Sequence, residues 1–144
     1  MDGSALNVVD SGQIELGMRN VLLRHEEIDR DRAQTLLDEM IELDAWTHPI
    51  LVERDTDVIL DGHHRYWCAE QLGLDLVPVF KVSYDDPALV LSSWRSDMTL
   101  VPGKVVAAAR SGRLFPKKTS RHVYAPGIIT CSIPLKQLLR GYIA

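Results

Sequence analysis

The sequence has few cysteines and no long hydrophobic run. Cys68 and Cys131 are its only cysteines and form no CxxC pair, which argues against a disulfide framework or a cysteine-based zinc site. We expect both thiols to be buried or uninvolved in chemistry. No apolar run approaches the roughly 20 residues of a membrane span, and residues 1–17 lack the basic and apolar regions of a secretory signal. These absences predict a cytoplasmic protein without a membrane partner.

A large excess of charge of one sign is also absent. The chain has 16 Lys and Arg against 20 Asp and Glu, a net charge of −4, which argues against sequence-independent binding of nucleic acid. Its composition, 46% hydrophobic and 25% charged, is that of a globular domain. A chain of 144 residues has the length of about one domain, and we find no internal repeat or linker. We therefore expect a single domain over residues 1–144.

Hydrophobic periodicity predicts a mixed α/β domain. Residues 29–43 have the apolar spacing of an amphipathic helix, with Asp29 or Asp31 as its N-cap. Its apolar face is expected to contain Ala33, Leu36, Leu37, Met40 and Ile41. Further helices are expected over 64–73, 103–112 and 134–141, and strands within 13–28 and over 48–54, 57–62, 75–84 and 127–133. Trp46 and Trp67 lie in or beside amphipathic patterns and are expected to pack.

The stretch VILDGHHRYWCAEQLG, residues 58–73, places polar side chains where a strand feeds a helix. The first turn of a helix exposes unpaired N–H groups and the positive end of the dipole, and both favour an anion. Arg65 adds a charged fork suited to phosphate, while His63 and His64 add tunable donors. Gly62 lets a ligand approach the backbone. The pattern predicts a phosphate site.

Two other interpretations of this stretch are open. The histidines could cap the helix while Arg65 pairs with a surface carboxylate. A zinc site is less well supported, because adjacent histidines project in different directions and the sequence has no HxH or HxxxH spacing.

The same stretch resembles the signature of the ParB/sulfiredoxin-like superfamily, in the DGHHR form that is typical of free serine kinases. The resemblance extends from the His-Glu pair in RHEEI to Trp94 in SSWRS and to SGRLFPKKTSRH, residues 111–122, in the same order. It covers roughly residues 18–140. It implies a compact single-domain α/β (α+β) fold, with a small mixed sheet flanked by helices. It also implies phosphoryl transfer from ATP or ADP, with Mg²⁺, to the hydroxyl of free L-serine or a close hydroxy amino acid.

The resemblance also implies roles for individual residues. Glu26 corresponds to the catalytic carboxylate, and a glutamate ionised at neutral pH can accept a hydroxyl proton. The residues expected to contact the donor phosphates are Asp61, Gly62, His63, His64 and Arg65, with Asp61 and His63 also counted as catalytic and Asp61 as the Mg²⁺ ligand. The residues expected to hold the amino acid are Trp94, Thr119, Ser120, Arg121 and His122.

Each of these roles has a plainer structural alternative. Glu27 is a rival to Glu26, and either could be an acid that complements a helix dipole. His25 is expected to orient or pack. Residues 116–122 could be a solvated basic loop, and Trp94 could belong to the core.

Departures from the family pattern argue against some of the functions found in the superfamily. The longer serine kinases carry an insertion where this chain has only residues 95–110, and Ser120 stands where the family commonly has threonine. His63 stands where sulfiredoxins have their catalytic cysteine, so sulfinic acid reduction is not expected. The chain has no room for the helix-turn-helix region of ParB proteins. The alternative function is a ParB-like nucleotide-binding or DNA-associated regulatory module without phosphotransfer, which would not need Glu26.

Overall fold

The computed structural model describes residues 13–125 and 127–140. A four-stranded mixed sheet lies at its centre, in the order β1 (Glu15–Met18), β5 (Leu76–Val82), β3 (Ile50–Glu53) and β4 (Ile59–Asp61). β3 and β5 are parallel, and the other neighbours are antiparallel. The predicted α/β fold with a small mixed sheet is confirmed. That residues 1–144 form one domain stays a prediction, because part of that range lies outside the described residues.

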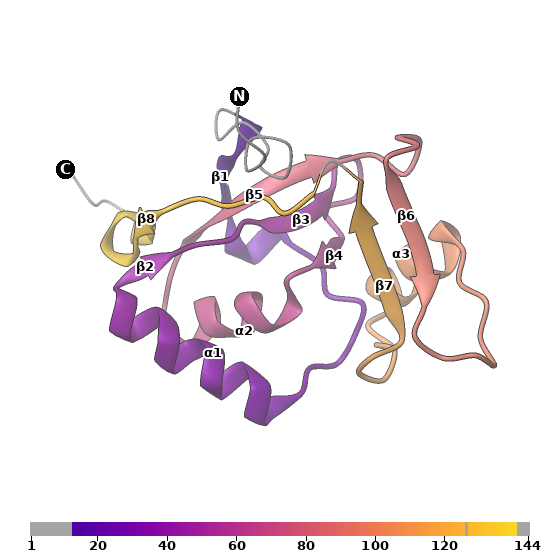
Figure 1. Cartoon of the computed structure of the whole chain (residues 1–144), viewed down its shortest axis with the longest axis horizontal. Coiled ribbons are helices and arrows are strands. Elements are labelled where there is room, and N and C mark those ends of the chain that lie inside the picture. Colours follow the sequence, from indigo (N-terminus) through magenta and orange to yellow (C-terminus); the bar gives the residue numbers. More distant parts are fainter. Residues whose placement is uncertain (1–12, 126, 141–144) are drawn as a thin grey trace.

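Helices and a two-stranded ribbon cover the two faces of this sheet (Figure 1). α1 (Arg30–Leu43) and α2 (His63–Gln71) pack on one face. α3 (Pro102–Ser111) and the antiparallel pair β6 (Leu89–Ser93) and β7 (Ser120–Tyr124) pack on the other. A short pair, β2 (Ala45–Trp46) with β8 (Ile133–Pro134), and the 3₁₀ turns Arg19–Val21 and Leu135–Leu138 complete the described structure.

The inner strands of the central sheet are continuous apolar runs in the sequence, because both faces of the sheet are buried. Ile50 and Val52 pack with α1 and α2, whereas Leu51 between them packs toward α3 and β6. Successive strand side chains point to opposite faces. Because both faces are buried, every position of β3 must be shielded from solvent.

Local signals placed most of the elements correctly. Asp29 is the N-cap of α1, and its side chain accepts hydrogen bonds from the N–H groups of Asp31 and Arg32. Gly112 ends α3 in the left-handed conformation. Trp46 is fully buried, and Trp67 is partly buried beneath the guanidinium of Arg30.

Three expectations were wrong. Ile41 is 54% exposed, because it lies at the edge of the apolar face of α1 and not within that face. Residues 127–132 form no strand, and only Ile133–Pro134 pairs, with β2. The expected helix over 134–141 is a single 3₁₀ turn, Leu135–Leu138, within the described residues.

Neither cysteine forms a disulfide. Cys68 is buried, as expected, and Cys131 is half-buried. None of the helices within residues 13–125 and 127–140 has the length and apolar character to cross a membrane.

Candidate functional site

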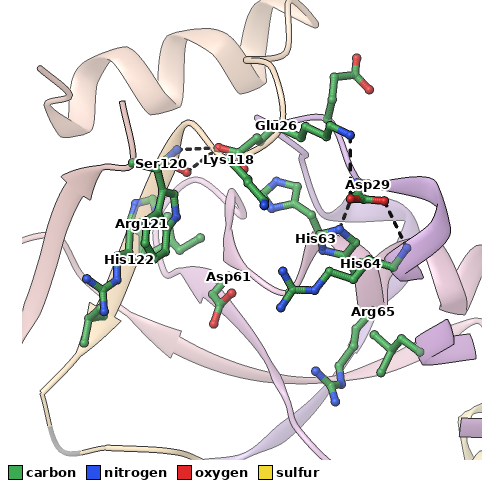
Figure 2. A pocket seen from close by; sticks show the side chains of 18 of the residues that line it. Glu26, Asp29, Asp61, His63, His64, Arg65, Lys118, Ser120, Arg121 and His122 are labelled. Atoms are coloured by element: carbon green, nitrogen blue, oxygen red, sulfur yellow. Dashed lines mark hydrogen bonds and ion pairs between the residues drawn. The ribbon is translucent and has the colours of Figure 1, made fainter. Parts of the chain in front are cut away.

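A cavity of about 700 Å³ lies where the start of α2, the segment before α1 and strand β7 meet (Figure 2). Nearly all the predicted site residues line it: Glu26, Asp61, Gly62, His63, His64, Arg65, Trp94, Ser120, Arg121 and His122. Thr119 does not. It is fully buried behind the wall, where its hydroxyl donates to the carbonyl of Pro116 and accepts from Arg95.

The sharp turn from β4 into α2 depends on Gly62. Its φ of 111° lies in the left-handed region, and a Cβ there would lie 3.3 Å from a side-chain carbon of Ile50. Glycine therefore allows the turn and brings the N-terminus of α2 to the cavity. Asp61, the last residue of β4, faces the same cavity. Burial of its carboxylate by the surrounding walls raises its pKa, and the Gly62 N–H and the charge of Arg65 oppose this.

The two histidines of the DGHHR stretch connect α2 to the segment before α1 by hydrogen bonds. Nε2 of His63 accepts the backbone N–H of His25 at 3.1 Å, and Nε2 of His64 accepts that of Asp29 at 3.1 Å. Burial lowers the pKa of both rings, that of His63 well below its usual range. Both are therefore neutral imidazoles with the proton on Nδ1. Neither caps α2, so the capping interpretation does not hold.

Arg65 has no carboxylate within ion-pair distance in the described part of the chain, so the interpretation as a surface ion pair does not hold either. Its Nη2 lies 3.2 Å from Nδ1 of His48, and its Nε is buried without a partner among the described residues. It stands between the main cavity and a second one of about 260 Å³, which is also lined by His48, Phe80 and Ile128. A half-buried guanidinium with an unpartnered N–H suits an anionic ligand.

The carboxylate of Glu26 is hydrogen-bonded to residues at the start of β7. Its Oε1 accepts from the N–H of Ser120 at 2.7 Å, the hydroxyl of Ser120 at 2.9 Å and the N–H of Thr119 at 3.3 Å. Burial raises its pKa, and these hydrogen bonds oppose the rise. Glu27, its rival, also lines the cavity but is exposed. Glu26 is thus the carboxylate with a defined orientation.

The expected basic loop is loop only over residues 116–119, because Ser120–Tyr124 forms a strand that pairs with β6. Nζ of Lys117 in that loop lies 3.8 Å from Oδ2 of Asp29. Trp94 is 60% exposed and does not belong to the core. The guanidinium of Arg121 lies 4.8 Å from the centre of its ring, a cation–π contact. Both side chains line the cavity.

His25, which was expected to orient or pack, is fully buried behind the cavity wall, with ring centres 4.5 Å from His63 and 5.6 Å from His122. The polar side of α1, where Arg32, Thr35 and Glu39 line the cavity, was not predicted. The signal was their spacing, because residues three and four apart share one helix face. The described residues contain no group of three or more His, Cys, Asp or Glu arranged around a metal.

No family model matches the sequence. A ParB-like protein of Sulfolobus acidocaldarius is 32% identical over 85 residues, 57% of this chain and 41% of that protein. An ATP-dependent L-serine kinase of Staphylothermus marinus is 32% identical over 77 residues, 51% of this chain and 31% of that protein. The chain thus spans less than half the length of these relatives.

Solved structures agree on the architecture. A free serine kinase in complex with AMP superposes with a TM-score of 0.80 at 11% identity, over 88% of this chain and 94% of that one. The chain has the fold of free serine kinase. SbnI from Staphylococcus aureus, with its C-terminus truncated, superposes on this chain with a TM-score of 0.74 at 13% identity, over 92% of this chain and 91% of that one. The resemblance to ParB-like proteins and free serine kinases is confirmed.

Proposed function

We propose that the chain is a phosphotransferase that moves a phosphoryl group from ATP or ADP to the hydroxyl of free L-serine, or a close hydroxy amino acid, giving O-phospho-L-serine. One observation carries the proposal. The oriented carboxylate of Glu26 and the N-terminus of α2, whose dipole favours an anion, line the same cavity. Phosphoryl transfer needs these two elements together, a base for the acceptor hydroxyl and groups that hold the donor phosphates.

The donor phosphates are proposed to lie at the start of α2. The free N–H groups after Gly62, the Nδ1–H groups of His63 and His64, and the charge of Arg65 are available there. The part of the cavity along the polar side of α1 has room for the rest of the nucleotide. Relatives described as ATP-dependent, and structures of the same fold with AMP and ADP, support a nucleotide donor.

Mg²⁺ fits the residues present. Asp61 presents one carboxylate to the cavity beside the α2 terminus, and Mg²⁺ with a nucleotide commonly takes one or two carboxylates, phosphate oxygens and water. The ion would neutralise charge on the donor phosphates. Asp61 is therefore proposed to hold it.

The amino acid is proposed to lie against β7. Arg121, stacked on Trp94, is placed to pair with the acceptor carboxylate, and His122 lines the same wall. Glu26 then takes the hydroxyl proton as the oxygen attacks the transferred phosphoryl group. Because these are free metabolites, we also propose that the protein acts in the cytoplasm.

Phosphorus NMR of the purified protein tests the function. The protein is incubated with Mg²⁺, ATP or ADP, and a panel of serine, threonine and homoserine. We expect an O-phosphoserine resonance and the matching nucleotide product. Nucleotide that binds in calorimetry but transfers no phosphoryl group to any acceptor would favour the ParB-like binding module instead.

Arg65→Ala is expected to weaken nucleotide binding by about 1.5 to 3 kcal/mol, the scale of a hydrogen bond to a charged group. Arg65→Lys should recover only part of this, because an ammonium lacks the planar fork. Calorimetric titration measures the loss, with Arg110→Ala on the exposed surface of α3 as the matched control. Wild-type affinity in a folded Arg65→Ala variant would remove the motif from the donor site.

Arg121→Ala is expected to lower kcat/KM for serine at least about tenfold, because the acceptor loses its carboxylate anchor. Nucleotide affinity should change much less. A steady-state titration of serine measures the effect, and Arg113→Ala, in the exposed turn after α3, is the control. Wild-type kinetics for Arg121→Ala would leave the amino-acid site unassigned.

A further inference from the structure

The hydroxyl of Ser120 bridges two ionisable side chains. Its Oγ lies 2.9 Å from Oε1 of Glu26 and 2.8 Å from Nε2 of His25. Figure 2 shows Ser120 beside Glu26 at the wall of the cavity. This hydroxyl is thus already engaged by the protein rather than open to a substrate.

A count of protons shows that this bridge has two alternative states. Nδ1 of His25 lies 2.7 Å from the carbonyl of Ile59, which can only accept, so Nδ1 carries the ring proton. Burial lowers the pKa of His25 to about 4, so the ring is neutral and its Nε2 is an acceptor. Ionised Glu26 is an acceptor as well. The single proton of the Ser120 hydroxyl therefore serves one of two acceptors at a time.

The charge on Glu26 decides between them. A hydrogen bond to a carboxylate is stronger than one to a neutral imidazole, so the hydroxyl donates to Glu26 while Glu26 is ionised. Once Glu26 is protonated, its Oε1 is a weaker acceptor. The hydroxyl can then rotate toward Nε2 of His25 without movement of any heavy atom.

We propose that Ser120 and His25 are positioning residues for Glu26, with the Ser120 hydroxyl donating to the carboxylate before transfer and to His25 afterwards. The inference rests on the proposed function. In the reaction, the acceptor O–H bond breaks and its proton passes to the Glu26 carboxylate. The acceptor oxygen forms a bond to phosphorus, the bond to the leaving nucleotide oxygen breaks, and Glu26 later releases its proton to solvent.

Other ionisable side chains line the same cavity as Glu26. They are Glu27 and Asp29 before α1, Arg32 and Glu39 on α1, Asp61 at the end of β4, His63, His64 and Arg65 on α2, Lys117 and Lys118 before β7, and Arg121 and His122 on β7. All of them remain in place in the variants below. A change in the Glu26 titration therefore reports on Ser120 and His25.

Removal of the Ser120 hydroxyl tests the first part of the proposal, the hydrogen bond from Ser120 to ionised Glu26. In Ser120→Ala, ionised Glu26 loses a donor, so its ¹³C carboxyl resonance, assigned with Glu26→Gln, should titrate at higher pH than in the wild type. The acidic limb of the kcat profile should move the same way, and kcat at neutral pH should fall about tenfold. KM for serine should stay unchanged, whereas a substrate-binding Ser120 would raise it. Ser120→Thr keeps the hydroxyl and should restore both readouts.

A pair of His25 variants tests the second part of the proposal, the role of His25 as the alternative acceptor for the Ser120 hydroxyl. Asparagine places its amide near the Nδ1 position and keeps the bond to Ile59 but offers Ser120 no second acceptor. The hydroxyl then stays on Glu26, so the Glu26 titration should move to lower pH, opposite to Ser120→Ala. Glutamine places its amide near the Nε2 position and should leave the titration near the wild-type value.

The outcomes separate this inference from the proposed function. An active wild type whose Glu26 titration is unmoved in Ser120→Ala overturns the positioning role alone. A wild type that transfers no phosphoryl group, but whose titration moves in opposite directions in the two variants, overturns the kinase and leaves the pairing of these residues standing. Should His25→Asn fail to fold, Ser120→Ala still decides the role of Ser120, since it deletes one oxygen from a half-buried side chain. His25→Gln then decides the role of His25, because a Glu26 titration that moves although an acceptor is kept at the Nε2 position would contradict it.

Discussion

Replacing Glu26 by glutamine is expected to lower the rate of phosphotransfer by about 10² to 10⁴-fold, the usual contribution of a general base. The amide carbonyl can still accept the N–H groups of Ser120 and Thr119, so the cavity should keep its shape. Only the ability to take a proton from the acceptor hydroxyl is lost. Single-turnover kinetics measures the rate, and calorimetry should show nearly unchanged nucleotide affinity.

Glu27→Gln is the matched control, because Glu27 is the adjacent exposed carboxylate on the same cavity. It should retain most of the activity. The opposite pattern, an active Glu26→Gln and an inactive Glu27→Gln, would assign the base to Glu27 and contradict the role read from the β7 contacts.

Acidification from pH 7 to pH 4 is expected to destabilise the fold by several kcal/mol. His25 and His122 are buried, and burial lowers their pKa to about 4 and about 3. In the unfolded chain both titrate near 6.5. Below that pH the unfolded state binds protons that the folded state does not bind. The free energy of unfolding that is present above pH 6.5 is therefore lost as the pH falls toward 4. His25 alone accounts for about 3 kcal/mol.

Chemical denaturation at a series of pH values measures this loss. His25→Gln, which lacks a group titrating in that range, should flatten the slope, whereas His48→Gln, at a half-buried ring, should change it less. Burial raises the pKa of Glu26 and Asp61, which opposes the loss at the acidic end. A slope that is the same in His25→Gln and in the wild type would contradict the role of His25 in this loss.

Much of the fold could be predicted because its signals are local. The N-cap Asp29, the glycine that ends α3 and the apolar runs of β3 and β4 each depend on a few neighbouring residues. The same holds for the anion site proposed at α2, since Gly62 and the helix that follows it are contiguous.

Strands β6 and β7 could not be predicted in this way. They pair across a long separation, from Leu89 with Tyr124 to Ser93 with Ser120, and neither has a continuous apolar run. Residues 127–133 show the converse error. Their β-branched composition favours a strand, but the segment finds a pairing partner only at Ile133–Pro134.

The residue types that the proposed chemistry needs, the DGHHR turn and the helix that follows it, were determined by the sequence alone, because a strand, one glycine and a helix start are set by short-range sterics. Tertiary structure decided how the Glu26 carboxylate is oriented. Its orientation comes from Ser120, 94 positions away, and the neutral state of His25 comes from burial between Ile59 and Ser120. Desolvation and hydrogen bonding at such separations depend on how the whole chain packs, and no local pattern records them.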